Sequence, residues 1–293
     1  MDSKECTVAE QVRIVEVGPR DGLQNEPGLV PLAAKIAFIE ALGAAGLTSI
    51  EATSFVSPKA VPQMADAGEV MSGIKRAAGV QYLALVPNER GLDRAIEAHV
   101  DVAALFTSAT ESFCQANIRC SIDESFSRFE PVVARAKTAG LLVRGYLSVA
   151  FVCPFDGDVA TDDAARVAER LFNLGSNDLC LADTVGKARP EQVHALIEKL
   201  SGVVPIEQIS LHVHDTDGRA LENIDAALEL GVRTFDSAAG GLGGCPFAPG
   251  APGNVATELV LSHLQMRGFE SGVDVAAIAR AFEIVSPYVR TTV

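Results

Sequence analysis

Two histidines separated by a single residue, His212 and His214, are the side chains of this sequence best placed for metal chemistry. They end a short run, residues 208–211, that has the pattern of a β-strand. Successive side chains on a strand point to opposite faces, so residues at i and i+2 share a face. Two imidazoles held together on a rigid strand provide part of a divalent-metal site. The alternative is that the two neighbours have separate roles, one bonding to the backbone and one exposed to solvent.

A second group of candidate residues follows the first strand-like run of the chain. Gly18-Pro19 introduces a turn, and Arg20 and Asp21 come directly after it. In the simplest interpretation the two charged residues form an ion pair within a loop. In the alternative, Asp21 is a hard oxygen ligand for a divalent ion and Arg20 stabilises a developing oxyanion.

Two further acids stand within or directly after apolar runs. Glu51 lies between Ile50 and Ala52, and Asp183 follows the run at 178–182. Because burying a carboxylate without a partner is costly, each acid is expected to be either paired or functional. We favour a function for Glu51, although an ion pair with an arginine explains it equally well.

Residues 237–254 form a segment too rich in glycine and proline to be a helix or a strand. A flexible connector is one interpretation, but a long loop in a compact fold is usually a lid or a binding loop. Cys245 lies in this loop, where a lone cysteine is suited to exchange a proton or to act as a nucleophile. Asn254 ends the loop and is either a helix cap or an oxygen ligand.

Eight short β-branched or apolar runs position these residues, and each is followed by a stretch of helix length. The runs are 12–17, 48–52, 81–86, 100–106, 142–149, 178–182, 208–214 and 233–237. Apolar residues recur at three- and four-residue intervals in the stretches between them, which are 31–45, 64–78, 89–98, 121–139, 161–174, 190–200 and 217–230. Further helices are expected at 254–266 and 274–288.

Strands that alternate with helices in one polarity are typical of a closed (β/α)8 barrel, which has about 250 residues. An open doubly wound sheet is the alternative, but it usually has a glycine-rich phosphate loop after its first strand, which residues 18–24 do not provide. No linker or shift in composition divides the chain. We therefore predict an α/β protein whose residues 1–293 form a single (β/α)8 TIM barrel with extra C-terminal helices. Active sites of such barrels lie at the carboxyl ends of the strands, where the candidate residues are found.

The composition excludes several classes of protein. The formal net charge is −14, so nucleic acid is not expected as a partner, because phosphate backbones need clustered Lys and Arg. No apolar run approaches the roughly 20 residues of a membrane-spanning helix, and the acidic N-terminus lacks the features of a signal or transit peptide. The six cysteines have neither paired zinc spacing nor the density of a secreted disulfide scaffold. We expect a soluble, cytoplasmic protein without membrane partners.

The order of these motifs resembles the 3-hydroxy-3-methylglutaryl-CoA (HMG-CoA) lyase family over nearly the whole chain. The matching segments are Gly18-Pro19-Arg20-Asp21-Gly22-Leu23-Gln24, Ile50-Glu51-Ala52, Gln115-Ala116-Asn117-Ile118, His212-Val213-His214-Asp215-Thr216 and residues 239–254. The segment Gly241-Leu242-Gly243-Gly244-Cys245-Pro246 is the most specific of them. The resemblance implies a metal-dependent barrel that cleaves HMG-CoA to acetyl-CoA and acetoacetate, acts on an acyl-CoA substrate and forms a homodimer.

The resemblance also implies roles for individual residues. The ligands of one divalent cation, Mg²⁺ or Mn²⁺, would be Asp21, His212, His214 and Asn254. The catalytic residues would be Arg20 at the enolate, Asp21 as the base, Cys245 in the catalytic loop, and Glu51 and Asp183 as supporting acids. The residues near the substrate would be Arg20, Gln24, Asn117 and Tyr146, although a tyrosine on a strand is more often part of the core. Three neutral ligands and one carboxylate favour Mg²⁺ or Mn²⁺ over structural zinc.

Departures from the family pattern leave the acyl chain of the substrate open. Asp217 stands where the animal enzymes carry tyrosine, and Phe151-Val152 stands where smaller residues are common. Relatives that cleave citramalyl-CoA or longer 3-alkyl-3-hydroxyglutaryl-CoA esters should share the metal and arginine residues. A Claisen condensing synthase is a further alternative, but synthases usually add a C-terminal regulatory region and lack the cysteine-bearing loop. A catalytically inactive acyl-CoA-binding protein is the alternative from another class, and the full set of retained site residues argues against it.

Overall fold

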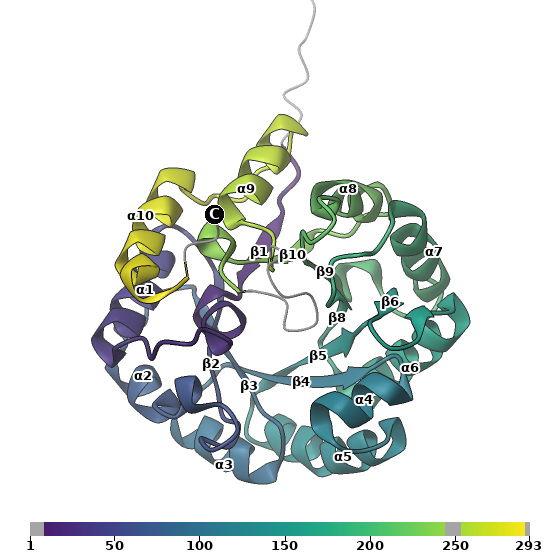
Figure 1. The fold of residues 1–293 in the computed structure, drawn as a ribbon, viewed down its shortest axis with the longest axis horizontal. Helices are drawn as coiled ribbons and strands as arrows, with labels where there is room; N and C mark the ends of the chain where they lie inside the picture. The colour runs from purple at the N-terminus through teal and green to yellow at the C-terminus, as the bar shows by residue number, and fades with distance from the viewer. Residues whose placement is uncertain (1–8, 244–252, 291–293) are drawn as a thin grey trace, which may run out of the picture.

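A closed barrel of eight parallel strands forms the centre of the computed structural model, which describes residues 9–243 and 253–290. Its strands are β1 (Arg13–Glu16), β2 (Ser49–Ser54), β3 (Gln81–Leu85), β4 (Val102–Ser108), β5 (Leu142–Ser148), β8 (Asp178–Asp183), β9 (Ile209–Val213) and β10 (Thr234–Ser237). The barrel closes because β1 pairs in parallel with both β2 and β10. Figure 1 looks down this barrel. The predicted eight-strand barrel is confirmed.

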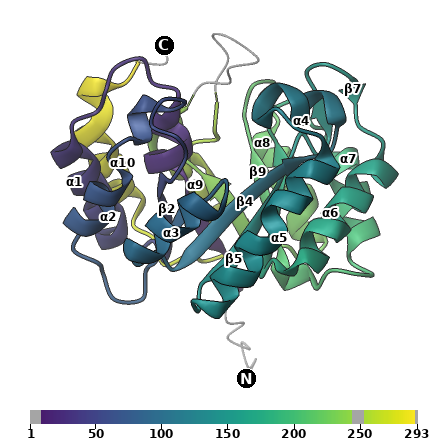
Figure 2. The ribbon, with the colours of Figure 1, turned by 90° about the horizontal axis from the view of Figure 1, so that it is seen from below.

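Helices surround the strands on all sides (Figures 1 and 2). In the described part of the chain the α-helices are α1 (Leu32–Ala44), α2 (Ala67–Gly73), α3 (Glu89–Glu97), α4 (Glu111–Ile118), α5 (Ile122–Thr138), α6 (Thr161–Gly175), α7 (Pro190–Leu200), α8 (Ala220–Glu229), α9 (Thr257–Met266) and α10 (Val275–Val285). Helix α9 follows β10 and completes the ring, whereas α10 is additional and packs against α1. The predicted C-terminal helices are therefore present, with one of them serving as the eighth barrel helix.

Local sequence signals explain where several of these helices begin and end. Ser121 and Glu124 form the reciprocal capping box at the start of α5. Helix α2 is shorter than the predicted stretch 64–78 because Ile74 adopts an extended backbone conformation. Gly73 ends this helix at a crowded position, where a Cβ would lie 2.4 Å from the Ile36 side chain.

Two small elements at the mouth of the barrel were not predicted. Helix α4 follows β4 and is capped by the Thr110 side chain, which accepts a bond from the Phe113 N–H. The hairpin of β6 (Val152–Cys153) and β7 (Gly157–Asp158) follows β5. Figure 2 shows α4 and β7 at the same end of the molecule.

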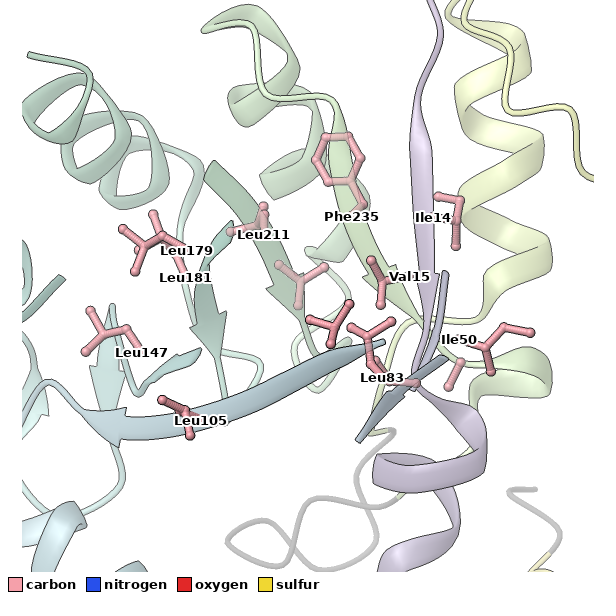
Figure 3. Packing of buried hydrophobic residues seen from close by; sticks show 14 of the residues in the cluster. Ile14, Val15, Ile50, Leu83, Leu105, Leu147, Leu179, Leu181, Leu211 and Phe235 are labelled. Atoms are coloured by element: carbon pink, nitrogen blue, oxygen red, sulfur yellow. The ribbon is translucent and has the colours of Figure 1, made fainter. Parts of the chain in front are cut away.

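Apolar side chains of the strands pack against the surrounding helices and form one large buried cluster. Figure 3 shows part of it, including Ile14, Leu147, Leu181, Leu211 and Phe235. Because side chains alternate along a strand, the residues between these apolar positions point into the barrel. None of the described helices is long and apolar enough to cross a membrane.

Candidate active site

A tight turn at the end of β1 brings Arg20 and Asp21 to the mouth of the barrel. The turn is a short π-helix, η1 (Gly18–Gly22), in which the N–H groups of Arg20, Asp21 and Gly22 donate to the Val17 carbonyl at 3.2, 2.8 and 3.1 Å. Gly18 is needed here, because a Cβ at this position would lie 2.5 Å from Oε1 of Glu16. The turn buries Arg20 and leaves Asp21 half-buried at the cavity.

His212 and His214 lie together, as the strand pattern predicted, and Asp21 lies beside them. His212 is on β9, His214 is the first residue after it, and their ring centroids are 5.1 Å apart. Nε2 of His214 is 4.0 Å from Oδ2 of Asp21. One ligand atom from each of the three residues lies within 4.8 Å of the others. The alternative in which one histidine is exposed is wrong, because both are buried.

Asn254 completes this group from the other end of the sequence. The chain at 253–255 runs beside the end of β9: the Asp215 N–H donates to Gly253 O at 2.9 Å, and the Val255 N–H donates to Val213 O at 3.3 Å. Nδ2 of Asn254 donates to Oδ2 of Asp21 and to the Leu242 carbonyl, both at 3.0 Å. The helix-cap alternative is therefore wrong: α9 begins three residues later and Ala256 is its N-cap.

The polar atoms of this group fit a divalent cation. Oδ1 of Asn254 is buried and accepts no hydrogen bond from the described residues. Burial lowers the pKa of His214 to about 3, so its imidazole is neutral and able to bind a metal. Burial opposes ionisation of Asp21, but Arg20, the two histidines and the hydrogen bond from Asn254 together hold the pKa of Asp21 well below its usual range. A carboxylate oxygen and two imidazoles thus converge, and the Asn254 amide lies beside that carboxylate; we name these four residues the metal cluster (Asp21, His212, His214 and Asn254).

Glu51 holds the guanidinium of Arg20 at the edge of the metal cluster. Nε and Nη2 of Arg20 lie 2.9 and 2.7 Å from Oε2 of Glu51, and Nη1 is 2.6 Å from Oδ1 of Asp21. Burial raises the pKa of Glu51, and the charge of Arg20 offsets part of that rise. Of the two interpretations of Glu51, the ion pair with an arginine is the one observed. Its partner is itself a candidate catalytic residue, so Glu51 acts on the site by orienting Arg20.

Asp236 and Arg144, two buried charged residues beneath the metal cluster, were not predicted from the sequence. Oδ2 of Asp236 is 3.2 Å from Nδ1 of His212, and its Oδ1 is 2.5 Å from Nη2 of Arg144. Burial opposes the charged form of Asp236, but the positive charge of Arg144 lowers its pKa. Asp236 lies within the strand-like run 233–237, so the argument applied to Glu51, an acid in an apolar strand, would also have identified Asp236.

A cavity of about 650 Å³ opens over the metal cluster at the carboxyl ends of the strands. Asp21, His212 and His214 line it. Its lining also includes apolar side chains, among them Val56, Leu85, Phe106, Phe113 and Phe129. The cavity is large enough for a small-molecule ligand that has a polar and an apolar part.

Some of the other predicted site residues line this cavity and others do not. Gln24, Asn117 and Tyr146 all line it, and Oε1 of Gln24 is buried without a hydrogen-bond partner among the described residues. Asn117 lies on α4 and not in a loop. Asp183 is not among the lining residues: its carboxylate accepts the N–H groups of Lys187 and Ala188 at 3.1 and 3.0 Å. Cys245 lies outside the described residues.

Comparison with known proteins shows a similarity that extends over nearly the whole chain. The model of the HMGL-like family matches residues 11–285. The hydroxymethylglutaryl-CoA lyase of Pseudomonas mevalonii is 48% identical over 271 residues, which are 92% of this chain and 90% of that protein. A protein of Pseudomonas aeruginosa named 3-hydroxy-3-isohexenylglutaryl-CoA/hydroxymethylglutaryl-CoA lyase is 48% identical over 93% of this chain and 91% of its own. The crystal structure of the HMG-CoA lyase from Brucella melitensis has a TM-score of 0.93 at 50% identity and covers 95% of this chain and 99% of its own.

Proposed function

The chain belongs to the HMGL-like family, and on that premise we propose that it cleaves HMG-CoA to acetyl-CoA and acetoacetate. The observation that carries the proposal is the metal cluster beside Arg20 at the floor of one cavity. A retro-Claisen cleavage needs two things at one carbon–carbon bond. The C3 hydroxyl must lose its proton, and the electron pair of the breaking C2–C3 bond must be stabilised as a thioester enolate.

Arg20 is suited to stabilise the enolate because its guanidinium is held rigidly and lines the cavity. A fixed cation beside a developing oxyanion needs no reorganisation during the reaction and is therefore effective. Glu51 and Asp21 raise the pKa of Arg20 although burial opposes this, so the guanidinium keeps its charge. The fixed geometry of this ion pair supports a role at the reacting oxygen.

Asp21 is the candidate base for the C3 hydroxyl, and its low pKa limits how it performs that role. A carboxylate with a depressed pKa removes a proton efficiently only from a hydroxyl whose own pKa has been lowered. A bound divalent cation supplies this effect when it polarises the hydroxyl and its neighbouring oxygen. Asp21 therefore serves as both ligand and proton acceptor. From the family resemblance alone, Cys245 would then deliver a proton to C2 of the enolate and so complete acetyl-CoA.

We propose Mg²⁺ or Mn²⁺ as the cation at the metal cluster. Two of the four proposed ligands, Asp21 and Asn254, offer hard oxygen atoms, and none of the four is a cysteine. Cysteine-rich tetrahedral sites are typical of structural zinc, whereas carboxylate and amide oxygens suit Mg²⁺ and Mn²⁺. The buried, unpaired Oδ1 of Asn254 supports this ligand set.

A second candidate substrate has a longer alkyl group at C3. The apolar side chains in the cavity lining, among them Leu85, Phe106 and Val56, support binding of an alkyl group larger than methyl. The name of the Pseudomonas aeruginosa relative contains both an isohexenyl substrate and HMG-CoA. A panel of citramalyl-CoA and 3-alkyl-3-hydroxyglutaryl-CoA esters, compared by kcat/KM, ranks these candidates.

One assay tests the proposed reaction. Purified protein is incubated with HMG-CoA, with and without Mg²⁺, and acetoacetate is measured; EDTA is then added. We expect release that requires the metal and stops with EDTA. Absence of metal-dependent cleavage of HMG-CoA and of every ester in the panel would refute the lyase assignment. Release of free CoA from acetyl-CoA and a 2-oxo acid would instead show a condensing synthase.

Two substitutions separate the roles of Cys245 and Asp21. Cys245→Ser should lower kcat greatly and leave Mn²⁺ affinity near the wild-type value, because a proton donor to carbon is not a ligand. Asp21→Ala should reduce both, because it removes a ligand and the proposed base. Loss of Mn²⁺ affinity in the Cys245 variant equal to that in the Asp21 variant would contradict the assignment.

We further propose that the protein is a cytoplasmic homodimer that acts in leucine degradation and ketone-body formation. The family resemblance supports the homodimer, and sedimentation velocity measures it directly. A single species with the mass of one chain, 30.7 kDa, would contradict it.

A further inference from the structure

A chain of buried polar side chains crosses the barrel interior beneath the metal cluster. Asp236 contacts His212 on one side and Arg144 on the other. Nη1 of Arg144 lies 3.3 Å from Oδ2 of Asp178, and its Nη2 donates to Oγ of Ser210 at 3.0 Å. Because β5 and β10 are not neighbours in the barrel, Arg144 and Asp236 meet across its interior.

The partners of Asp236 determine which groups donate. Its Oδ1 receives Nη2 of Arg144, and a guanidinium only donates hydrogen bonds. Its Oδ2 receives Nδ1 of His212 at 3.2 Å and the Cys180 thiol at 3.7 Å. A carboxylate paired with a buried guanidinium is ionised and only accepts. Nδ1 of His212 must therefore carry the hydrogen.

The proton position on His212 decides which nitrogen can bind a metal. In a neutral imidazole one nitrogen is protonated and the other has a free lone pair. With the hydrogen on Nδ1, the lone pair is on Nε2, the nitrogen that does not contact Asp236. His214 differs: its Nδ1 is buried and has no hydrogen-bond partner among the described residues. Only one of the two histidines therefore has its tautomer set by a carboxylate.

We propose that Asp236 is a positioning residue that fixes the Nδ1–H tautomer of His212 and keeps Nε2 free for the divalent cation, while Arg144 holds Asp236 in place. The proposal rests on the proposed metal cluster. Carboxylates that accept the second N–H of a ligating histidine fix the ring and raise its basicity, and losing them usually weakens metal binding about 10–100-fold.

The substitution Asp236→Asn tests this because the neighbours dictate how the amide is oriented. Arg144 only donates, so the amide oxygen must face Arg144 and the amide NH₂ must face Nδ1 of His212. Nδ1 then has to accept, and the hydrogen moves to Nε2. Glu16→Gln makes the same carboxylate-to-amide change and is a matched control at a buried carboxylate on β1 that contacts neither histidine.

The experiment uses two measurements on the full chain. The ¹⁵N shifts of the imidazoles in the metal-free protein report the tautomers, with His212 and His214 assigned by His212→Gln and His214→Gln variants. Titration with Mn²⁺ alone, followed by the electron paramagnetic resonance of free Mn²⁺, gives the affinity of each variant. We expect Nδ1–H at His212 in the wild type, Nε2–H in Asp236→Asn, and a Kd for Mn²⁺ raised about 10–100-fold in that variant only.

Each outcome bears on the proposal. Nε2–H at His212 in the wild type overturns it, and so does a folded Asp236→Asn variant whose Kd matches that of the wild type. If Asp236→Asn does not fold, the His212 tautomer measured in the wild type still tests the proposal. A wild type that shows Nδ1–H but binds no Mn²⁺ supports the His212–Asp236 assignment and refutes the metal cluster, so the two failures are distinguishable.

Discussion

Two buried arginines each hold two carboxylates in this barrel, and they differ in what can reach them. Arg20 contacts Glu51 and Asp21, and Arg144 contacts Asp236 and Asp178. The Arg20 side chain is 9% exposed and lines the cavity, whereas that of Arg144 is 1% exposed and does not. The same ion-pair chemistry therefore faces the cavity in one place and only fixed protein groups in the other.

Access to the cavity decides what each arginine can contribute. A guanidinium that faces a ligand can stabilise charge that develops during a reaction. A guanidinium enclosed by fixed carboxylates instead stabilises the charges that are already there. Loss of Arg20 should accordingly appear first in the rate, and loss of Arg144 should appear first in the stability.

Arg144→Met is expected to have the largest effect, and it should act on stability. The substitution leaves Asp236 buried and without its cation, which typically costs about 3–5 kcal/mol. Urea unfolding of the wild type and the variant measures this difference. The control is Arg166→Met, because Arg166 is 69% exposed in its pair with Asp163 and should change stability by less than about 1 kcal/mol. Equal effects of the two substitutions would contradict the role given to Arg144.

Arg20→Lys should act mainly on the rate. Lysine keeps a positive charge near Glu51 but lacks the planar fork that contacts Glu51 and Asp21 together. We expect kcat to fall about 100-fold or more, the size seen when one stabilising donor is lost, with a smaller change in unfolding free energy than in Arg144→Met. A variant that loses stability and keeps its kcat would reverse the comparison between the two arginines.

The barrel and most of the metal cluster could be predicted from the sequence because both follow from short-range patterns. The alternation along residues 208–214 is enough to place His212 and His214 on one face. The eight strand-like runs then place Asp21 at the same end of the barrel, since all strands run in one direction. The fold class was obtained in this way, whereas the family and the grouping of Asp21 with the two histidines as metal ligands followed from the resemblance of the motifs.

Features that depend on tertiary contacts could not be obtained from those patterns. Asn254 has the sequence context of a helix cap, and only its pairing beside β9 turns its side chain toward Asp21. Asp183 and Glu51 both stand in apolar strands, yet Asp183 points to the backbone of its own loop and Glu51 points to Arg20. Strand periodicity does not say which buried acid faces the cavity, because that depends on the partner across the barrel.

Glu16 shows what a buried carboxylate does when it has no arginine. Its oxygens accept the N–H groups of Gly18 and Ala239 at 2.8 and 2.9 Å and the hydroxyl of Thr257 at 2.7 Å. Burial raises the pKa of Glu16 from 4.5 to about 7, and these hydrogen bonds only partly oppose the rise. The folded protein therefore binds this proton more tightly than the unfolded chain. The contribution of Glu16 to stability is complete below pH 4.5 and is lost as the pH rises to about 7.

Glu16→Gln should remove this pH dependence and is expected to have the smallest effect of the three. Between pH 5 and 6 the wild type should lose up to about 1.4 kcal/mol of stability through Glu16, and the variant should not. Glutamine can keep the bonds to Gly18 and Ala239 and donate to Thr257, whose hydroxyl then turns to Ser237 2.8 Å away. Urea unfolding at pH 5, 6 and 7 measures both proteins, and all other titrating groups cancel in the difference. Parallel stability curves would show that Glu16 is ionised in the folded protein although no cation contacts it.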